Sequence, residues 1–228
     1  MQSLLREGLK ACRPVTLNIQ QARSVVFVRG ERVRGLIRDP EDILTSNGRR
    51  YGLNDANLKP LKQFLGDEYK LTDKMILQVI THKSFAHGTR PYNEKLSILG
   101  EELLRLAASK YALAKGVVNG DASDYKFSVG DINFDCLGSL THRLIVTNRL
   151  LSEYAESQGI DKVFFCKVAL PRNYSQDQAK DYKPKAMYST ITSSLVGAIA
   201  IQRGKNTAEK FVQEKVLAGI LPAINERK

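Results

Sequence analysis

The sequence predicts an all-α domain preceded by an extended basic N-terminal segment. From Asn57 onward, Leu, Ile and Val recur with the spacing of one helix face, and Gly, Asn and Asp clusters separate the periodic stretches. Residues 1–38 instead contain eight Lys or Arg and two Glu, a net charge of +6 within the chain's total of +11. We therefore expect a basic Arg-rich extension and linker at residues 1–55 and a helical domain at residues 56–228.

The composition indicates a folded domain without a membrane span and favours some classes of partner over others. With 228 residues, 43% of them hydrophobic, the chain can bury a core. It has no apolar run near the length of a membrane-spanning helix, so we expect no membrane span. Cys12, Cys136 and Cys166 are scattered and only three His are present, so neither a zinc site nor another metal or cofactor is expected. The positive charge favours a polyanionic partner, either nucleic acid or an anionic membrane.

The N-terminal extension carries two kinds of pattern. Residues 1–14 mix Leu with Arg and Lys, as in an organelle-targeting segment, although Glu7 is atypical. Residues 15–35 combine short β-branched runs with Arg and Gly, which favours an extended tail on RNA over an exposed β-hairpin. Candidate RNA contacts here and in the following linker are Arg13, Arg23, Arg29, Arg32, Arg34, Arg38, Arg49 and Arg50.

The helical elements follow in order. After a linker over 39–57 with a turn at Asn47-Gly48, we expect helices at 59–65, ended by Gly66, and from Asp73, with Thr72 as its cap. A long helix opens at Pro91 and runs to about Ala114. A Gly- and Asp-containing loop at 116–133 separates it from a helix at 134–154. Further helices are predicted at 188–204 and at about 208–218.

Three less regular features have open interpretations. His82 at the end of the second helix is interpreted as a core or capping histidine held by a backbone carbonyl, whereas His87 and His142 have no evident partners. Residues 167–186 form a basic polar loop. A solvated loop and a second RNA contact explain it equally well.

The stretch from Asn93 to Leu104 is the best candidate for a chemical site. Glu94, Ser97 and Glu101 stand at i, i+3 and i+7, on one side of a helix. Two carboxylates on one stripe could begin a metal site, but on an isolated helix a solvated acidic face explains them better.

Several motifs in order resemble the ribonuclease III family over residues 73–217. Asn93-Glu94-Lys95-Leu96-Ser97-Ile98-Leu99-Gly100-Glu101 resembles the family's signature Asn-Glu-Arg-Leu-Glu-Phe-Leu-Gly-Asp, and Thr81-His82-Lys83-Ser84 resembles the His-x-Ser element before it. Leu195-Val196-Gly197-Ala198-Ile199 resembles the Leu-Ile-Gly-Ala-Ile of the second catalytic helix. The resemblance implies a ribonuclease III-like helical domain. No separate double-stranded-RNA-binding domain follows it in this sequence.

The resemblance also implies which acids are changed. In the family, four carboxylates hold Mg²⁺ for phosphodiester hydrolysis. The matching positions are Glu94, Ser97 and Glu101 on the first helix and Thr190 and Ser193 on the second. Because neutral hydroxyls cannot offset the charge of a divalent ion, we expect weak Mg²⁺ binding and no RNA cleavage. Ile98 replaces a Phe that lies at the homodimer interface in the enzymes, which suggests altered pairing or ordinary packing.

A ribonuclease III fold without its acids, behind a basic extension, resembles the ribonuclease III-like proteins of the fungal mitochondrial large ribosomal subunit. This resemblance implies a structural role in the mitochondrial matrix, with ribosomal RNA and other large-subunit proteins as partners. A second ribonuclease III-like subunit could pair with the chain as a heterodimer. Two alternatives stay open: an active Mg-dependent endonuclease that processes mitochondrial RNA, and a non-ribosomal RNA-binding assembly factor.

Overall fold

The computed structural model describes residues 44–46, 48–115, 128–129, 132–169 and 182–226. Residues 1–43 lie outside these ranges, so the predictions made for the N-terminal extension and for Arg13, Arg23, Arg29, Arg32, Arg34 and Arg38 are not addressed by the fold. The described part is mainly helical, as the sequence predicts, and none of its helices is long and apolar enough to cross a membrane.

A short hairpin and two helices come first. Strands β1 (Thr45–Ser46) and β2 (Arg49–Arg50) pair antiparallel with Ser46 opposite Arg49. Gly48 between them has a φ of 73°, as the predicted turn requires. Helix α2 (Asp55–Leu65) stops at Gly66 as predicted but begins within the predicted linker. Helix α3 (Asp73–Val79) begins after Thr72 as predicted, but the Thr72 hydroxyl makes no capping hydrogen bond and instead accepts one from the Gln202 side chain. The 3₁₀ turn η2 (Phe85–Gly88) follows.

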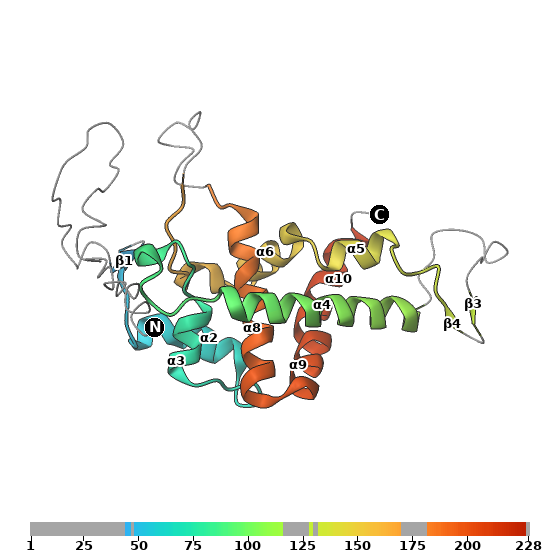
Figure 1. The fold of residues 1–228 in the computed structure, drawn as a ribbon, viewed down its shortest axis with the longest axis horizontal. Helices are drawn as coiled ribbons and strands as arrows, with labels where there is room; N and C mark the ends of the chain where they lie inside the picture. Colours follow the sequence, from blue (N-terminus) through green and yellow to red (C-terminus); the bar gives the residue numbers. More distant parts are fainter. Residues whose placement is uncertain (1–43, 47, 116–127, 130–131, 170–181, 227–228) are drawn as a thin grey trace, which may run out of the picture. The chain divides into compact units, whose positions relative to one another are not determined.

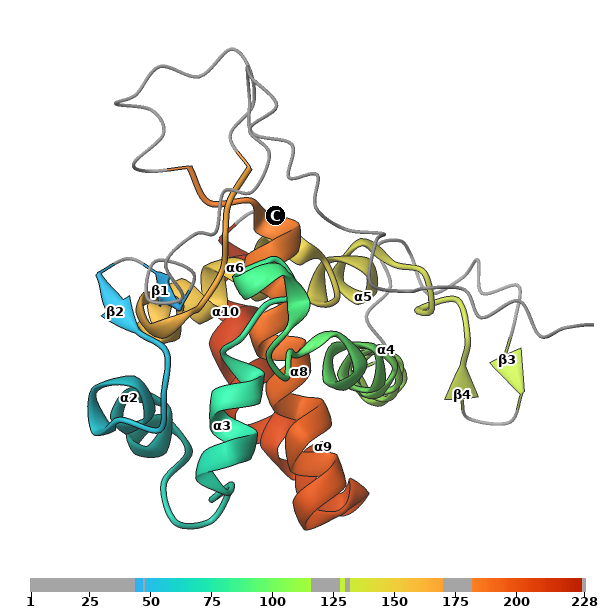
Figure 2. The same cartoon turned by 60° about the vertical axis from the view of Figure 1, so that its left-hand side comes forward.

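Two long helices form the centre of the domain. Helix α4 (Glu94–Lys115) crosses α8 (Lys185–Arg203), and Figure 1 shows the crossing. In Figure 2, α8 lies between α3 and α4. Small residues bring the two backbones into contact, because a Cβ on Gly100 or Gly197 would overlap a carbonyl oxygen of the opposite helix. This crossing fixes the relative positions of the two helices that carry the candidate site.

The region between these helices differs from the sequence prediction. The second hairpin, β3 (Ser128–Val129) with β4 (Ile132–Asn133), lies within the predicted loop. The single helix expected at 134–154 is wrong. A turn at 135–138 is followed by two helices, α5 (Leu140–Ile145) and α6 (Asn148–Ser157). Thr147 caps α6, since its hydroxyl accepts the Leu150 N–H and donates to the Leu144 carbonyl, so the first helix cannot continue.

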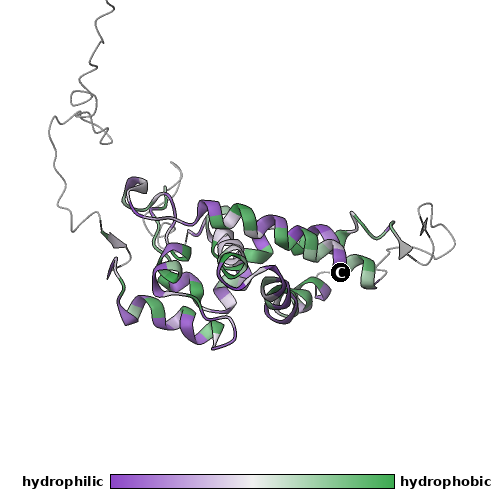
Figure 3. Ribbon diagram, turned by 60° about the horizontal axis from the view of Figure 1, so that its bottom comes forward, coloured by the Kyte–Doolittle hydropathy of each residue, from purple (hydrophilic) through white to green (hydrophobic). Residues whose placement is uncertain are grey.

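The C-terminal helices are longer than predicted. Helix α8 ends at Gly204, which has a φ of 89°, and α9 (Lys205–Phe211) starts immediately. It runs through a π-helical turn η5 (Val212–Leu217) into α10 (Ala218–Asn225). Each helix carries both hydrophobic and hydrophilic residues (Figure 3), and Tyr69, Phe85, Phe165 and Phe211 are among the largest fully buried side chains.

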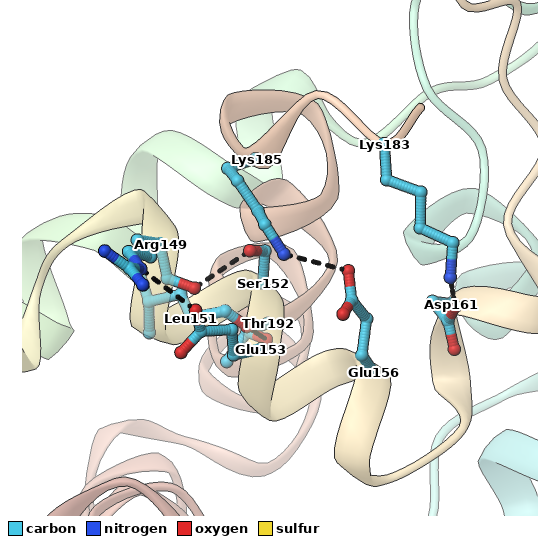
Figure 4. A network of polar contacts seen from close by, with 9 residues as sticks. All are labelled: Arg149, Leu151, Ser152, Glu153, Glu156, Asp161, Lys183, Lys185 and Thr192. Atoms are coloured by element: carbon cyan, nitrogen blue, oxygen red, sulfur yellow. Dashed lines mark hydrogen bonds and ion pairs between the residues drawn. The ribbon is translucent and has the colours of Figure 1, made fainter. Parts of the chain in front are cut away.

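Polar contacts fix the start of α8 against α6 and the 3₁₀ turn η4 (Ile160–Val163) (Figure 4). Lys183 pairs with Asp161 at 2.5 Å, and Lys185 pairs with Glu156 at 3.2 Å. About two turns beyond Lys185, the Thr192 hydroxyl donates to the Leu151 carbonyl at 3.0 Å. These contacts hold the N-terminal half of α8, and with it Thr190, in one position relative to α6.

Candidate functional site

A pocket of about 500 Å³ lies between the N-terminal halves of α4 and α8. Its lining residues are His82, Lys83, Asn93, Glu94, Ser97, Ile98, Glu101, Pro184, Ala186, Met187 and Thr190. Four of the five positions singled out in the sequence therefore meet at one pocket. Ser193 does not line it, because its side chain is fully buried at the crossing of the two helices.

The two acids on α4 already have partners within the chain. The Glu94 Oε1 accepts a hydrogen bond from the Lys83 ammonium at 2.6 Å, and both side chains are largely exposed. One turn along the helix, the buried Ser97 hydroxyl donates to Glu101 Oε1 at 3.1 Å. The i, i+3 and i+7 stripe predicted from the sequence thus contains one ion pair and one internal hydrogen bond.

The hydroxyls on α8 are bonded to their own helix. The Thr190 hydroxyl donates to the Met187 carbonyl at 2.6 Å and accepts the Asn93 side-chain N–H at 3.2 Å. The Ser193 hydroxyl donates to the Ser189 carbonyl at 3.4 Å. Asn93 also donates to the Val79 carbonyl, so it links α3, α4 and α8. These groups act as structural hydrogen-bonding groups.

The Mg²⁺ site implied by the resemblance does not fit these side chains. The ion prefers oxygen ligands in octahedral geometry, and carboxylates supply the balancing charge. The five positions offer two carboxylates, and the charge of one is offset by Lys83. Each missing carboxylate removes an attraction on the order of several kcal/mol at an effective dielectric near 20. No cluster of three His, Cys, Asp or Glu suited to a metal occurs among the described residues.

His82 is a structural histidine, although not in the way expected. Its Nδ1 accepts the Ser84 backbone N–H at 3.1 Å and contacts the Ser84 hydroxyl at 2.9 Å, so Ser84 rather than a carbonyl holds the ring. Burial is the main cause that lowers the pKa of His82 below 6.5. The charge of Lys83 adds to this effect, and Glu94 opposes it. The imidazole is therefore favoured in its neutral form, with Nδ1 as an acceptor.

His142 has partners that sequence reasoning missed. Its Nε2 lies 3.0 Å from the Ser109 hydroxyl on α4, and its Nδ1 accepts the Gly138 N–H at 3.1 Å. Ser139 also caps α5 by accepting the His142 N–H. The sequence Gly138-Ser139 before α5 could have predicted this cap. The contact between His142 and Ser109, which are 33 residues apart, could not have been predicted from the sequence.

Of the eight arginines predicted to contact RNA, the described residues include Arg49 and Arg50. Both lie on β2, where Arg50 is exposed and Arg49 is half-buried. The basic loop at 167–186 is described at its two ends only. There Lys183 and Lys185 pair with Asp161 and Glu156, so these two cations serve the fold.

Comparisons with known proteins agree with this fold. The family described as ribonuclease-III-like matches residues 72–220. The nuclease domain of ribonuclease III from Campylobacter jejuni superposes with a TM-score of 0.51 at 23% identity, over 71% of this chain and 97% of that one. Ribonuclease 3 of Bdellovibrio bacteriovorus is 25% identical over 166 residues, which are 71% of this chain and 61% of the relative.

Two further relatives are fungal proteins named large ribosomal subunit protein mL57. The Neurospora crassa protein is 26% identical over 224 residues, which cover 89% of this chain and 78% of the relative. The Schizosaccharomyces pombe protein is 23% identical over 157 residues, covering 68% of this chain and 66% of the relative. The all-α, ribonuclease III-like fold expected from the sequence is confirmed. Since the family match spans well over half of the sequence, the chain belongs to the ribonuclease-III-like family.

Proposed function

We propose that this chain is a structural component of the mitochondrial large ribosomal subunit, located in the matrix, that binds ribosomal RNA and neighbouring proteins. The match to the Neurospora protein named mL57, which covers nearly the whole chain, carries this proposal. A second fungal relative with the same name supports it. The basic residues 1–55 would provide an RNA-contacting extension, with Arg13 to Arg38, Arg49 and Arg50 on phosphates, ahead of the helical domain at 56–228.

The same proposal assigns no catalysis to the pocket between α4 and α8. Ser97, Thr190 and Ser193 stand at positions where the ribonuclease III enzymes carry acids, and their hydroxyls hydrogen-bond within the fold. The remaining Glu94 is paired with Lys83. A pocket with this charge balance has little affinity for a divalent ion, so the fold would serve as architecture.

A paired arrangement with a second ribonuclease III-like subunit fits the exposed apolar residues of α4. Ile98, at the edge of the pocket, is 60% exposed, and Leu99 and Leu106 on neighbouring positions of the helix surface are 38% and 39% exposed. Apolar side chains grouped on one helix face are typical of an interface. An Ile98→Glu variant should lose such a partner in pull-down from mitochondrial lysate, while Lys74→Glu, on the exposed part of α3, should retain it.

Sedimentation of mitochondrial ribosomes in high salt tests the main proposal. Integral ribosomal proteins stay with the large subunit, whereas a factor held by phosphate contacts is released as salt rises. We expect this chain to co-sediment with the large subunit at high salt. Release at moderate salt would instead favour the non-ribosomal assembly factor.

An RNA-processing endonuclease is the second candidate, because the chain resembles a bacterial ribonuclease 3 and keeps carboxylates at Glu94 and Glu101. Incubation with double-stranded RNA and Mg²⁺ or Mn²⁺ separates the two candidates. Cleavage that disappears in Glu94→Ala or Glu101→Ala would establish the endonuclease and contradict the scaffold.

A further inference from the structure

Three segments far apart in sequence meet beside the candidate site. They are Arg49–Gly52, His82–Tyr92 and Phe165–Ala169, and we call them together the basic turn surface. The Ser46 hydroxyl beside the first segment donates to the Cys166 carbonyl at 3.0 Å, the His82 N–H donates to the Phe165 carbonyl at 2.9 Å, and the Lys167 N–H donates to the Ser84 hydroxyl at 2.9 Å. Hydrogen bonds thus join the second segment to the third, and the strand that precedes the first segment is also bonded to the third.

Aromatic rings form the base of this surface. Tyr51, Phe85 and Phe165 contribute one ring from each segment, and their centroids are 5.3–5.4 Å apart in all three pairs. Phe85 and Phe165 are buried, while Tyr51 is half-buried. This cluster of tilted and edge-to-face rings packs the three segments against one another.

The charge of the surface has one sign. The three segments contain five Lys or Arg residues and no Asp or Glu. The five are Arg49, Arg50, Lys83, Arg90 and Lys167, and Lys83 forms an ion pair with Glu94 of α4. Arg90 is exposed and its guanidinium lies 5.9 Å from the centre of the Tyr51 ring. An arginine held on an aromatic face retains its donors for an anion and loses less freedom on binding.

The turn that presents Arg90 is strained. Ala86 and His87 have φ values of 44° and 54°, and Gly88 follows at 71°. Among the described residues, Ala86 and His87 are the non-glycine residues with positive φ. Thr89 secures the turn through its N–H and its hydroxyl, both of which donate to the Ala86 carbonyl. Strained backbone persists where the surroundings hold it in place, and it concentrates at binding sites.

We propose that the basic turn surface binds the phosphate backbone of RNA. This inference rests on the proposed function and assigns it a second RNA contact, on the helical domain rather than on the N-terminal extension. Three adjoining segments that carry five cationic residues and no acidic ones, with one arginine over a tyrosine ring, match an RNA strand. A protein partner fits less well, because the exposed large hydrophobic residues of the described chain all lie outside the three segments. Leu53, the nearest in sequence, lines a different hollow with Leu71 and Thr72.

The test uses the full chain and a labelled single-stranded RNA, with affinity measured over a salt series. The variant Arg90→Gln/Lys167→Gln removes two cations from the surface. The control Lys74→Gln/Lys215→Gln removes two exposed cations from α3 and η5. Because each lost phosphate contact reduces the slope of log affinity against log salt by about 0.7, we expect a reduction of about 1.4 in the first variant and none in the control. Arg90→Lys, which keeps the charge, should keep the slope.

Equal losses in the surface variant and the control would overturn the proposal, since binding would then depend on overall charge. An unchanged slope in a surface variant that still melts like the wild type would also overturn it, while leaving the proposed function intact. Failure of the wild-type chain to bind RNA at all would contradict both. Displacement of the RNA by polyglutamate at equal charge would assign the surface to an acidic protein instead.

Discussion

The backbone carbonyl of Ser193 on α8 occupies the place that a side-chain carbon on Gly100 of α4 would need. The contact is reciprocal, since a Cβ on Gly197 would overlap the Leu96 carbonyl. The two helices therefore cross with their backbones touching, and this approach places Glu101 and Thr190 around one pocket. The two glycines thus fix the helix crossing beside which the pocket lies.

Replacing Gly100 or Gly197 with Ala should destabilise the domain strongly. The added carbon must displace a helix backbone, and overpacking of this kind costs about 3 kcal/mol or more. Urea unfolding should show the loss in both variants. Gly52→Ala is the matched control, because a Cβ there would meet only the Asn54 side chain at 3.6 Å or more, and it should change stability by less than about 1 kcal/mol. Comparable stability of Gly100→Ala and Gly52→Ala would contradict the described crossing.

Introducing acids at Thr190 and Ser193 on α8 should have unequal effects on stability. Ser193 is fully buried, so Ser193→Glu places a carboxylate in the core and should cost about 3 kcal/mol or more. Thr190 lines the pocket and is only half-buried, so Thr190→Asp should cost about 1 kcal/mol. Unfolding curves with and without Mg²⁺ provide the measurement. A large Mg²⁺-dependent recovery of Ser193→Glu alone would show that this position can still join a metal site.

Lys183, just before α8, and Lys185, its first residue, should differ in how much stability is lost when each is replaced. Lys183 pairs with Asp161, whose side chain is 5% exposed and whose second oxygen has no hydrogen-bond partner among the described residues. Lys183→Met leaves this carboxylate buried and uncompensated, at a cost of about 3 kcal/mol. Lys185→Met removes the partner of the more exposed Glu156 and should cost less than about 1 kcal/mol. Thermal melts of both variants decide this. If Asp161→Asn in the Lys183→Met background restored no stability, the buried charge would not be the cause.

The pH dependence of stability should report on His82. Its pKa is lowered in the folded chain, so between the unfolded value of about 6.5 and the lower folded value the unfolded chain binds more protons. Above pH 6.5 the contribution of His82 to the free energy of unfolding is at its maximum. It declines as the pH falls from 6.5 to the lower folded pKa, and below that pKa it no longer changes. His82→Asn should remove the decline, whereas His87→Asn on the exposed turn should keep it. Urea unfolding over a pH series measures this dependence. The same change of unfolding free energy with pH in both variants would contradict the assignment to His82.

Helix ends were predictable where one residue decides them. Gly66 and Gly204 end helices because their positive φ suits glycine, and Thr72 precedes α3 as expected. The break at Thr147 was not predictable from periodicity, since apolar residues continue on both sides of it. It depends on a hydroxyl that bonds the backbone in both directions.

The positions of site residues on one helix could be predicted from the sequence, whereas contacts between residues of different elements could not. The spacing of Glu94, Ser97 and Glu101 places them on one face, and the structure brings all three to the pocket. The ion pair between Lys83 and Glu94, eleven positions apart, depends on the intervening turn, whose strained backbone has no signal in the sequence. The burial of Ser193 likewise depends on the crossing of α4 with α8 rather than on local pattern.

Cleavage of double-stranded RNA by the purified full chain, over a range of Mg²⁺ and Mn²⁺ concentrations, tests most directly whether the fold serves as scaffold. A bacterial ribonuclease III run in parallel would show that substrate and ions are competent. We predict intact RNA at every ion concentration, with no difference between the wild type and Glu94→Ala/Glu101→Ala. Metal-dependent cutting by the wild type that this double variant lacks would contradict the account.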